Sequence, residues 1–455
     1  MVYTRVYASC MPAEFPDERS ETAFTDYKLP LSPAQAAVEA GRCLFCHDAP
    51  CVTACPTHID IPQFIRKIAN ANDRGAARTI FESNILGMSC ARVCPVEVLC
   101  VGACVYNDLE EPPIQIGKLQ RHATDRAFEE GWRFFEAGAP TGRRVALVGG
   151  GPAGMAAAHE LRRLGHACTI LERRGFLGGL NTTGIAPHKM KADRGVTEAE
   201  WVLGIGGVEV RTGVELGRDV SPADLERDFD AVFVGIGLGA DSRAALPGED
   251  LPGVHGAVEW IERMKLSDAG TAGVRSAVVV GAGNTALDAV RELLALGIPR
   301  VTMLYRGTEA GMGGYAHEWD AAKEAGARAE WCAVATSFEG ASRLERLRCV
   351  RVDGSRRPVP GTEFALEAQL ALVAIGQSRL GSALAGLAGI RVEQGILRVD
   401  AHGFTGRPGW YAGGDCANGG KEVVNAAAEG MAAARAIDRE LAAGGGTGRK
   451  EVDRA

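Results

Sequence analysis

The chain has 455 residues, of which 46% are hydrophobic and 24% are charged. This composition is that of ordinary soluble proteins, and it excludes collagen-like, disordered and membrane-spanning classes. The formal net charge of −7 provides no overall positive field for a polyanion, so we expect no nucleic-acid partner.

Two residue counts depart from the average. There are 59 glycines without a fixed period, and 13 cysteines, of which eight lie between Cys43 and Cys104. Residues 1–20 contain no basic stretch followed by an apolar core, and no run of about 18 apolar residues occurs, so we expect a cytoplasmic protein with no membrane segment. In a reducing compartment, clustered cysteines are more often metal-binding or redox-active than disulfide-bonded.

Residues 1–140 have a helical pattern, interrupted by prolines, and contain the cysteine cluster. The cysteines form two closely spaced runs, each with a Cys-Pro step: Cys43, Cys46, Cys51 and Cys55, then Cys90, Cys94, Cys100 and Cys104. Such runs are typical of ferredoxin-type iron–sulfur clusters, in which one cysteine of a run serves the other cluster. Two structural zinc sites could use the same residues. Because nucleotide-binding motifs follow, we favour two clusters that conduct electrons, with His47 and His58 as surface or packing residues.

After an amphipathic helix expected over residues 117–135 and a linker over 136–144, the pattern changes at Arg144. Short apolar runs now alternate with glycines and helical stretches, which is typical of an α/β fold with Rossmann-like units. Two of these stretches, 144–165 and 276–297, resemble each other. The sequence therefore predicts two dinucleotide-binding units.

The first glycine loop follows a strand expected at 145–148 and has the G-x-G-x-x-G spacing at Gly149, Gly151 and Gly154, with Pro152 and Ala153 opening the next helix. These glycines permit a tight turn, a close approach to a pyrophosphate and close packing of helix on strand. The strand 167–172 ends at Glu172, where an acid can accept hydrogen bonds from ribose hydroxyls.

Two further segments favour FAD in this first unit. Residues 175–180 contain a glycine pair, Gly178 and Gly179, which is followed by Leu180 and lets the backbone approach the cofactor. Residues 409–420 place Gly414 and Asp415 between an apolar strand and a helix from about 422 to 441. This arrangement resembles the closing segment of the flavoprotein reductases with two dinucleotide domains, in which the aspartate holds the ribityl chain and the helix points its N-terminus at the flavin.

The second glycine loop follows a strand at 276–280 and predicts a nicotinamide nucleotide site. It has the G-x-G-x-x-A spacing at Gly281, Gly283 and Ala286, with Asn284 and Thr285 available to phosphate oxygens. The strand 301–306 ends at Arg306, which can stack on adenine or pair with a 2′-phosphate. The apolar strand 370–377 closes this unit at Gly376, so the nicotinamide unit is expected to be inserted within the FAD unit.

Residues 43–68, 89–107 and 112–125 resemble the N-terminal cluster domain of dihydropyrimidine dehydrogenase, its separate bacterial NAD-dependent subunit, and the glutamate synthase small subunit; the resemblance spans about 30–441. It implies two [4Fe–4S] clusters, one held by Cys43, Cys46, Cys51 and Cys104, the other by Cys55, Cys94, Cys100 and the amide oxygen of Gln120. Spacing alone favours Cys90 over Gln120, whereas the family cysteine that matches Cys90 is not a ligand.

The resemblance also bears on the nucleotide sites. Lys189 falls where the family has a basic residue in a loop near the cofactor, although Ala186 replaces that loop's proline. Family members that use NADPH have a second basic residue after the arginine, and the stretch from Gly307 to Gly314 has none. We therefore expect NAD(H) in preference to NADP(H).

We predict a helical iron–sulfur domain over 1–140, an FAD domain over 141–250 and 379–446, an NAD(P) domain over 251–378 and a flexible tail over 447–455. This division leaves no chain for an organic substrate pocket. We therefore expect an electron-transfer subunit of a hetero-oligomer, whose catalytic partner carries its own redox centre and resembles dihydropyrimidine dehydrogenase. A glutamate synthase small subunit or the NAD(P)-coupling subunit of another oxidoreductase is the alternative.

Two other functions are possible for such a chain. A disulfide reductase needs a dithiol beside the flavin, but Cys168, Cys332, Cys349 and Cys416 are isolated in the sequence. A structural or regulatory subunit would need no intact site, whereas the loop glycines, Glu172 and Asp415 are all present. Hydride transfer between the two cofactors needs stacking rather than a catalytic acid or base, so we assign no catalytic residue.

Overall fold

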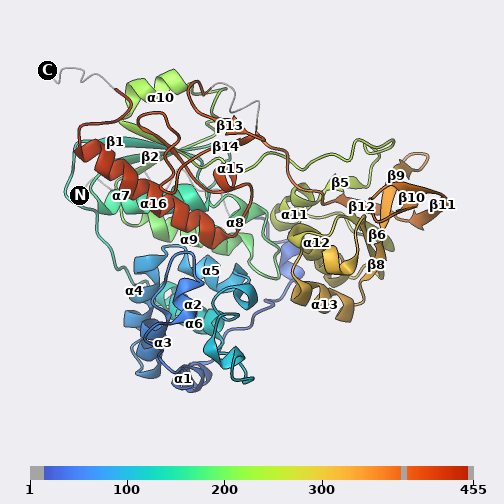
Figure 1. Ribbon diagram of the computed structural model, residues 1–455, viewed down its shortest axis with the longest axis horizontal. Coiled ribbons are helices and arrows are strands. Elements are labelled where there is room, and N and C mark those ends of the chain that lie inside the picture. Colours follow the sequence, from blue (N-terminus) through green and yellow to red (C-terminus); the bar gives the residue numbers. More distant parts are fainter. Residues whose placement is uncertain (1–14, 381–386, 449–455) are drawn as a thin grey trace.

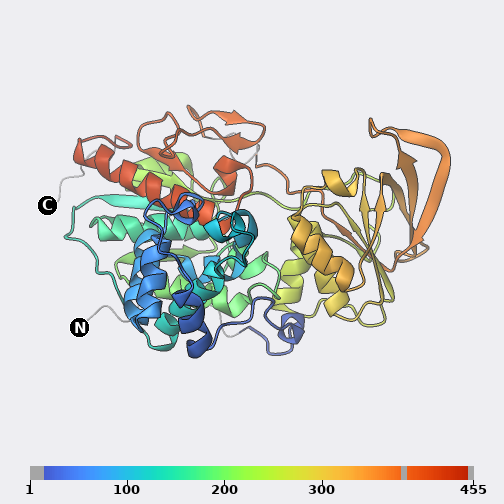
Figure 2. The same cartoon turned by 60° about the horizontal axis from the view of Figure 1, so that its bottom comes forward.

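The computed structural model describes residues 15–380 and 387–448, which form three lobes (Figure 1). A helical domain lies beside a first Rossmann-like unit, and a second Rossmann-like unit projects to one side of both (Figures 1 and 2). The α/β class and the N-terminal helical domain predicted from the sequence are confirmed. Among the described residues, no helix is long and apolar enough to cross a membrane.

Short helices with clear end signals build the helical domain. Asp60 accepts a hydrogen bond from the amide of Gln63 (3.0 Å) and so caps the helix whose buried face is Ile61, Phe64, Ile65 and Ile68. The helix expected over 117–135 ends at Glu129, because Gly131 adopts a left-handed conformation (φ +63°) just after it. The helices are η1 (Ser20–Ala23), α1 (Pro33–Gly41), α2 (Pro50–Thr53), α3 (Ile61–Ala69), α4 (Asp73–Ser83), α5 (Gly87–Val93), η2 (Val96–Val98), η3 (Val105–Asn107) and α6 (Ile116–Glu129).

The first Rossmann unit contains a parallel sheet in the order β15-β4-β1-β2-β3. Strand β15, at one edge of this sheet, comes from far along the chain. The polypeptide therefore leaves the sheet after β4 and returns to it with β15. The elements are β1 (Arg144–Val148), α7 (Pro152–Arg163), β2 (Ala167–Glu172), α8 (Leu180–Thr183), α9 (Ala192–Leu203), β3 (Val208–Thr212), α10 (Pro222–Asp228), β4 (Ala231–Val234), β13 (Val392–Glu393), β14 (Ile396–Leu397), β15 (Trp410–Ala412), α15 (Asp415–Asn418) and α16 (Val423–Ala442). Helices α7 and α16 pack against each other on one face.

The second Rossmann unit lies between β4 and β15 in the chain. Its parallel sheet has the order β5-β12-β6-β7-β8, and an antiparallel sheet β11-β10-β9 extends from it. The elements are β5 (Val254–Gly256), α11 (Ala257–Leu266), β6 (Ser276–Val280), α12 (Asn284–Ala295), β7 (Arg300–Tyr305), η4 (Glu309–Gly311), α13 (Ala316–Glu324), β8 (Arg328–Trp331), β9 (Ala333–Glu339), β10 (Arg346–Val352), β11 (Pro358–Glu367) and β12 (Leu370–Val373). Strand β12 is shorter than the predicted 370–377 and ends before Gly376, which adopts φ +106°.

The predicted flexible tail, residues 447–455, begins with a residue that is hydrogen-bonded to the first Rossmann unit. The amide of Thr447 donates to the carbonyl of Asp230 (2.9 Å), and the hydroxyl donates to the carbonyl of Phe229 (2.7 Å). Residues 449–455 of the predicted tail lie outside the described residues.

Candidate cofactor sites

Four cysteines, which we name the outer cysteine group, surround a small void in the helical domain. The void has a volume of about 30 Å³ and is otherwise lined by apolar residues such as Leu44, Ile65 and Ile116. Burial, followed by the neighbouring thiols, raises the pKa of Cys51 to about 12. A bound metal would be needed to hold such thiols as thiolates at neutral pH. The group consists of Cys43, Cys46, Cys51 and Cys104.

A second set, the inner cysteine group, consists of Cys55, Cys94, Cys100 and Gln120. The three cysteines are buried, and burial followed by the adjacent Cys55 raises the pKa of Cys100 to about 12. The Nε2 atom of Gln120 donates to the carbonyl of Gly87 (2.8 Å), which fixes the buried amide and leaves its oxygen as an acceptor. Cys90 lies nearby, and its sulfur accepts a hydrogen bond from Asn84 (3.1 Å).

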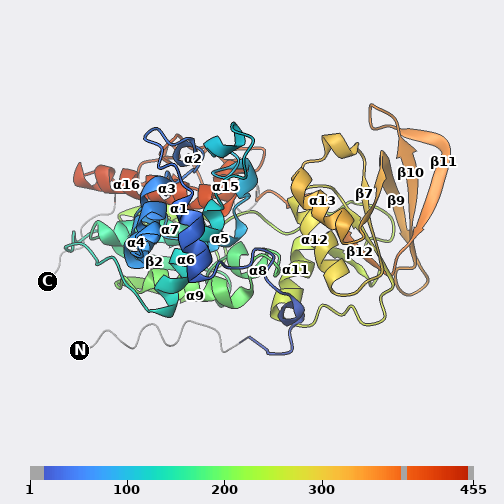
Figure 3. The same ribbon diagram turned by 90° about the horizontal axis from the view of Figure 1, so that it is seen from below.

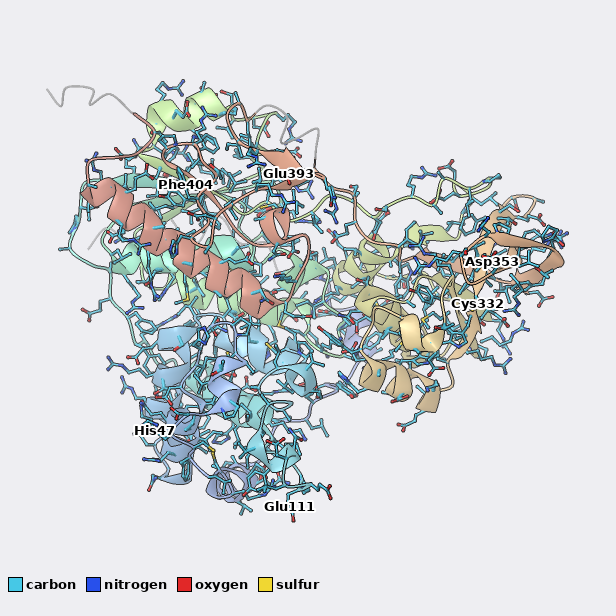
Figure 4. All side chains as sticks on the ribbon, viewed as in Figure 1. His47, Glu111, Cys332, Asp353, Glu393 and Phe404 are labelled. Carbon is cyan, nitrogen blue, oxygen red and sulfur yellow. The ribbon has the colours of Figure 1, made fainter. Side chains whose placement is uncertain are left out.

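Among the described residues, no three His, Cys, Asp or Glu side chains are close enough to hold one metal ion. The choice between iron–sulfur clusters and zinc therefore rests on the cysteine pattern of the sequence, two closely spaced runs that each contain a Cys-Pro step. The side chain of His47 is fully exposed on the surface of the helical domain (Figure 4).

The first glycine loop forms a tight cradle at the end of β1. Gly149 adopts φ +106°, and an added Cβ would lie 2.4 Å from the carbonyl oxygen of Gly235. A Cβ on Gly154 would lie 2.0 Å from the carbonyl oxygen of Gly149, so only glycine lets α7 approach the strand this closely. Gly151 precedes the first turn of α7, whose free amides face an anion such as a pyrophosphate.

Two carboxylates lie near this cradle. Glu172 is buried at the end of β2, and its oxygens accept hydrogen bonds from the amides of Gly150 and Arg174 (both 2.8 Å). Each carboxylate oxygen has a second acceptor position, which leaves the side chain able to bind a hydroxyl. Burial raises the pKa of Asp415, which follows Gly414 (φ +74°) and begins α15.

The cradle opens into a cavity of about 520 Å³ that all three lobes line. Val93 and Pro95, the chain neighbours of Cys94, form part of its wall on the side of the helical domain. Lys421, Glu422 and Val423 bring the start of α16 to the cavity. The predicted residues in its wall are Gly149, Gly151, Pro152, Ala153, Glu172, Gly179, Leu180, Lys189, Asn284, Gly414 and Asp415.

The second glycine loop reaches this cavity only through Asn284. Gly281 adopts φ +131°, and an added Cβ would lie 2.2 Å from the carbonyl oxygen of Ala374, so the turn requires glycine. Asn284 begins α12, and its side chain accepts a hydrogen bond from the amide of Tyr315 (3.2 Å). Arg306 lies just beyond the end of β7 and is exposed. The other predicted residues outside the cavity wall are Gly154, Gly281, Gly283, Thr285, Ala286 and Gly376.

Lys189 lies in the cavity wall and is buried between two carboxylates of the second Rossmann unit. Its Nζ atom is 2.7 Å from Asp288 and 2.7 Å from Glu318. These two charges outweigh the effect of burial and raise the pKa of Lys189, so it is a cation at neutral pH. Tyr315 also crosses between the units, because its hydroxyl donates to Glu422 (2.9 Å).

Sequence reasoning missed several residues of the cavity wall. Val93 and Pro95 come from the helical domain, whereas Asp288, Tyr315 and Glu318 come from the second Rossmann unit. None of them belongs to a motif of its own. The only sequence signal was the position of Val93 and Pro95 on either side of a predicted ligand.

The fold and these sites define a pyridine nucleotide oxidoreductase of the flavoprotein type that carries an iron–sulfur domain. Residues 143–430 match the family model described as pyridine nucleotide-disulphide oxidoreductase, and residues 19–132 match the model described as dihydropyrimidine dehydrogenase domain II, 4Fe–4S cluster. The chain belongs to the pyridine nucleotide-disulphide oxidoreductase family, in the branch with this N-terminal iron–sulfur domain.

Two curated relatives are similar over nearly their whole length. The NAD-dependent dihydropyrimidine dehydrogenase subunit PreT of Salmonella typhimurium is 34% identical, over 90% of this chain and 95% of that protein. The small chain of the NADPH glutamate synthase of Escherichia coli is 32% identical, over 94% and 96%. Among solved structures, FprA of Mycobacterium tuberculosis has the same fold over 66% of this chain and 85% of its own, with a TM-score of 0.56 and 21% identity.

Proposed function

We propose that this chain is an electron-input subunit, which exchanges hydride between NAD(P)H and FAD and passes single electrons through two [4Fe–4S] clusters to or from a partner. One observation carries the proposal: the central cavity is lined by the second Rossmann unit on one side and by the chain neighbours of Cys94 on the other. Both ends of an electron path therefore meet at one site.

The residues around the cavity suit FAD. The cradle of Gly149, Gly151 and Gly154 would hold the pyrophosphate, Glu172 the adenosine ribose and Asp415 the ribityl chain. When bound, FAD supplies the exchange between two-electron and one-electron chemistry. The start of α16 would place its positive dipole end at the cavity and stabilise negative charge there.

The two cysteine groups would continue the path outward. The inner group is buried and flanks the cavity, whereas Cys43, Cys46, Cys51 and Cys104 are all partly exposed. Leu44, between two ligands of the outer group, is 53% exposed. Electrons would therefore leave the chain near the outer group. A partner subunit with its own redox centre would receive them there.

The site supports a disulfide reductase less well than an electron-input subunit. None of the residues in the cavity wall is a cysteine. Cys416 is buried beside Asp415, and burial raises its pKa to about 12. Cys332 lies in the second Rossmann unit, remote from the first glycine loop (Figure 4). The described chain therefore offers no dithiol in contact with the proposed flavin position.

Similarity to known subunits bears on the type of partner, and the residues after Arg306 bear on the choice between NAD(H) and NADP(H). Similarity to the PreT subunit favours a dihydropyrimidine dehydrogenase type of partner, and similarity to the glutamate synthase small chain supports the alternative. Arg306 is followed by no basic residue as far as Gly314, which favours NAD(H). We retain the domain limits 1–140, 141–250 with 379–446, and 251–378 as part of the proposal.

Anaerobic mixing of the purified chain with NADH or NADPH tests this function. We expect about eight iron atoms per FAD, bleaching of the flavin band by either nucleotide, and a higher kcat/KM with NADH in steady state when an artificial electron acceptor such as ferricyanide is added. Four iron atoms, or no bleaching with either nucleotide, would contradict the proposal. A kcat/KM ratio that favours NADPH would overturn only the nucleotide preference.

A further inference from the structure

The segment before α1 of the helical domain, which includes the short helix η1, runs across the other two lobes. We name residues 15–31 the strap. In Figures 2 and 3 its dark blue trace leaves the helical domain and carries η1 to a position beside α11 of the second Rossmann unit. It belongs to neither glycine-loop motif nor to the cysteine runs.

The strap contacts the second Rossmann unit through the buried Phe24, a pair of hydrogen bonds at Ser20, and the Tyr27 ring, which lies 4.2 Å from the Arg291 guanidinium of α12. Phe24 is 5% exposed and belongs to the core of that unit, with Trp260 and Ile261 of α11. The amide of Ser20 donates to the carbonyl of Ser267 (3.0 Å), and the amide of Ala269 donates to the Ser20 hydroxyl (2.9 Å).

Other strap residues bind the first Rossmann unit. Glu21 is fully buried and accepts hydrogen bonds from the amide of Ala192 (3.0 and 3.2 Å), at the first turn of α9. The Arg19 guanidinium pairs with Glu21 and with Asp193 of the same turn. The amide of Tyr27 donates to the carbonyl of His188 (2.7 Å).

The end of the strap is bound to the helical domain. Arg121 of α6 pairs with Asp26 and donates to the carbonyl of Lys28. The Lys28 ammonium donates to the carbonyl of Cys94 (3.0 Å), a member of the inner cysteine group. One short segment thus touches all three lobes, on the path from the nucleotide side to the cluster side.

The direct contacts between the two Rossmann units are mostly polar. They include Lys189 with Asp288, Tyr315 with Glu422, and Arg174 with Glu262. The fully buried Lys265 of α11 also donates to the carbonyls of Ile185 and Met190 (2.8 and 2.9 Å) in the first unit. Opening this seam would return these groups to water, and their hydration would offset much of what the contacts contribute. Burial of a phenylalanine side chain favours the docked state about ten- to a hundredfold. Domains joined only by chain crossings rotate by default unless an interface holds them.

We infer that the strap is a positioning element, which holds the second Rossmann unit in one orientation over the cavity through Phe24 and Ser20. This inference rests on the proposed function, because the orientation it fixes places Asn284 and Tyr315 at the proposed flavin site. The nucleotide side and the cluster side then face the cavity together, and electron transfer needs no rotation of one unit against the other.

Amide hydrogen exchange and rapid-mixing kinetics of the full-length, FAD-loaded chain test the inference. Phe24→Ala should raise exchange of peptides containing Ser20 and Ala269 at least tenfold. The limiting rate of flavin bleaching by NADH should fall about tenfold, with the Kd for NADH unchanged. Phe24→Leu should restore most of both. Leu29→Ala is the matched control, because Leu29 is a strap residue that is 65% exposed.

Unchanged exchange and an unchanged limiting rate in Phe24→Ala would overturn the inference, and so would rapid exchange at Ser20 and Ala269 in the unmodified protein. If Phe24→Ala does not fold, Ser20→Ala takes its place, with smaller changes in the same direction expected and no change overturning the inference. If the unmodified protein is not bleached by NADH or NADPH, the proposed function fails, while the exchange measurements still decide whether the strap is docked.

Discussion

At the scale of single residues, the chain buries polar side chains at positions where a further negative charge would be unfavourable. The amide of Gln120 and the carboxyl group of Glu198 are two examples. Gln120 is a buried neutral side chain that we propose as the fourth ligand beside Cys55, Cys94 and Cys100, and the Gly87 carbonyl holds its nitrogen in place. As a ligand, its neutral oxygen would add no negative charge to the three cysteine ligands. A cluster bound there would therefore carry one charge less than its all-cysteine counterpart, which raises its reduction potential.

Gln120→Ala should change one cluster and leave the other intact. We expect an altered EPR signal or a shifted potential for the inner cluster only, because the outer cysteine group lacks this residue. Cys90→Ala is the comparison variant: Cys90 is buried, hydrogen-bonds Asn84 and the Cys94 thiol, and is the ligand that spacing alone favours, so on the proposed ligand set its removal should leave the inner cluster assembled. Loss of both clusters, or of neither, in Gln120→Ala would count against the proposed ligand set.

Glu198 illustrates a buried acid that serves the packing of two lobes. It lies on α9, is fully buried, and accepts hydrogen bonds from the amide (3.0 Å) and hydroxyl of Ser89 on α5. Burial raises its pKa to about 7, against the opposing effect of the Ser89 hydrogen bonds. The native state therefore holds a proton that the unfolded chain releases near pH 4.5.

The stability of the protein should accordingly fall as pH rises from about 4.5 to 7, by about 3 kcal/mol from this group, and level off above pH 7. Glu198→Gln keeps the contacts with Ser89 and removes the titration. The urea midpoint of this variant should therefore change less with pH across this range, and at pH 8 it should be higher than that of the unmodified protein. Glu200→Gln, an exposed position on the same helix, should change nothing. An equal pH slope in Glu198→Gln would contradict this assignment.

At the scale of elements, the glycine loops determine how closely helix and strand approach. Gly154→Ala would place a Cβ at 2.0 Å from the Gly149 carbonyl oxygen, so α7 must shift away from β1. We expect at least a tenfold loss of FAD affinity, measured by the flavin content and by reconstitution with added FAD. Gly175→Ala, in a nearby loop where an added Cβ meets no atom within 4 Å, should bind FAD normally. Full FAD content in Gly154→Ala would exclude this loop as the pyrophosphate site.

The sequence predicted the elements whose signal is local. The strands 167–172 and 276–280 coincide with β2 and β6, because an apolar run followed by a glycine turn has few other solutions. Arg306 is the last residue of the predicted strand 301–306 but lies one residue beyond the observed strand, since β7 ends at Tyr305. The strap was not predicted, because Phe24 and Glu21 contact segments more than 160 residues away and show no periodic pattern.

Lys189 shows the same limit at the site itself. Its position beside the cavity could be expected from the loop that contains it, whereas its partners Asp288 and Glu318 come from the inserted unit. Helix patterns assign these two acids to α12 and α13 but give no sign that one cation joins them. Such pairings depend on how the two units meet, which only the tertiary structure determines.

At the scale of the whole molecule, the three lobes meet at one cavity of about 520 Å³. The second Rossmann unit is inserted within the first, and the strap joins both to the helical domain at Arg121 and Cys94. We propose that electrons enter at the nucleotide side and leave near Leu44, where a partner subunit receives them. On this account the chain works as one part of a larger enzyme.

Anaerobic purification of the tagged chain from its own cells, with assays of the isolated chain and of any co-purifying protein, tests this account most directly. We predict a second chain in fixed ratio, which carries its own redox centre, and NADH-dependent reduction of an organic substrate only when both chains are present. Reduction of an organic substrate such as uracil by the isolated chain with NADH would contradict the account.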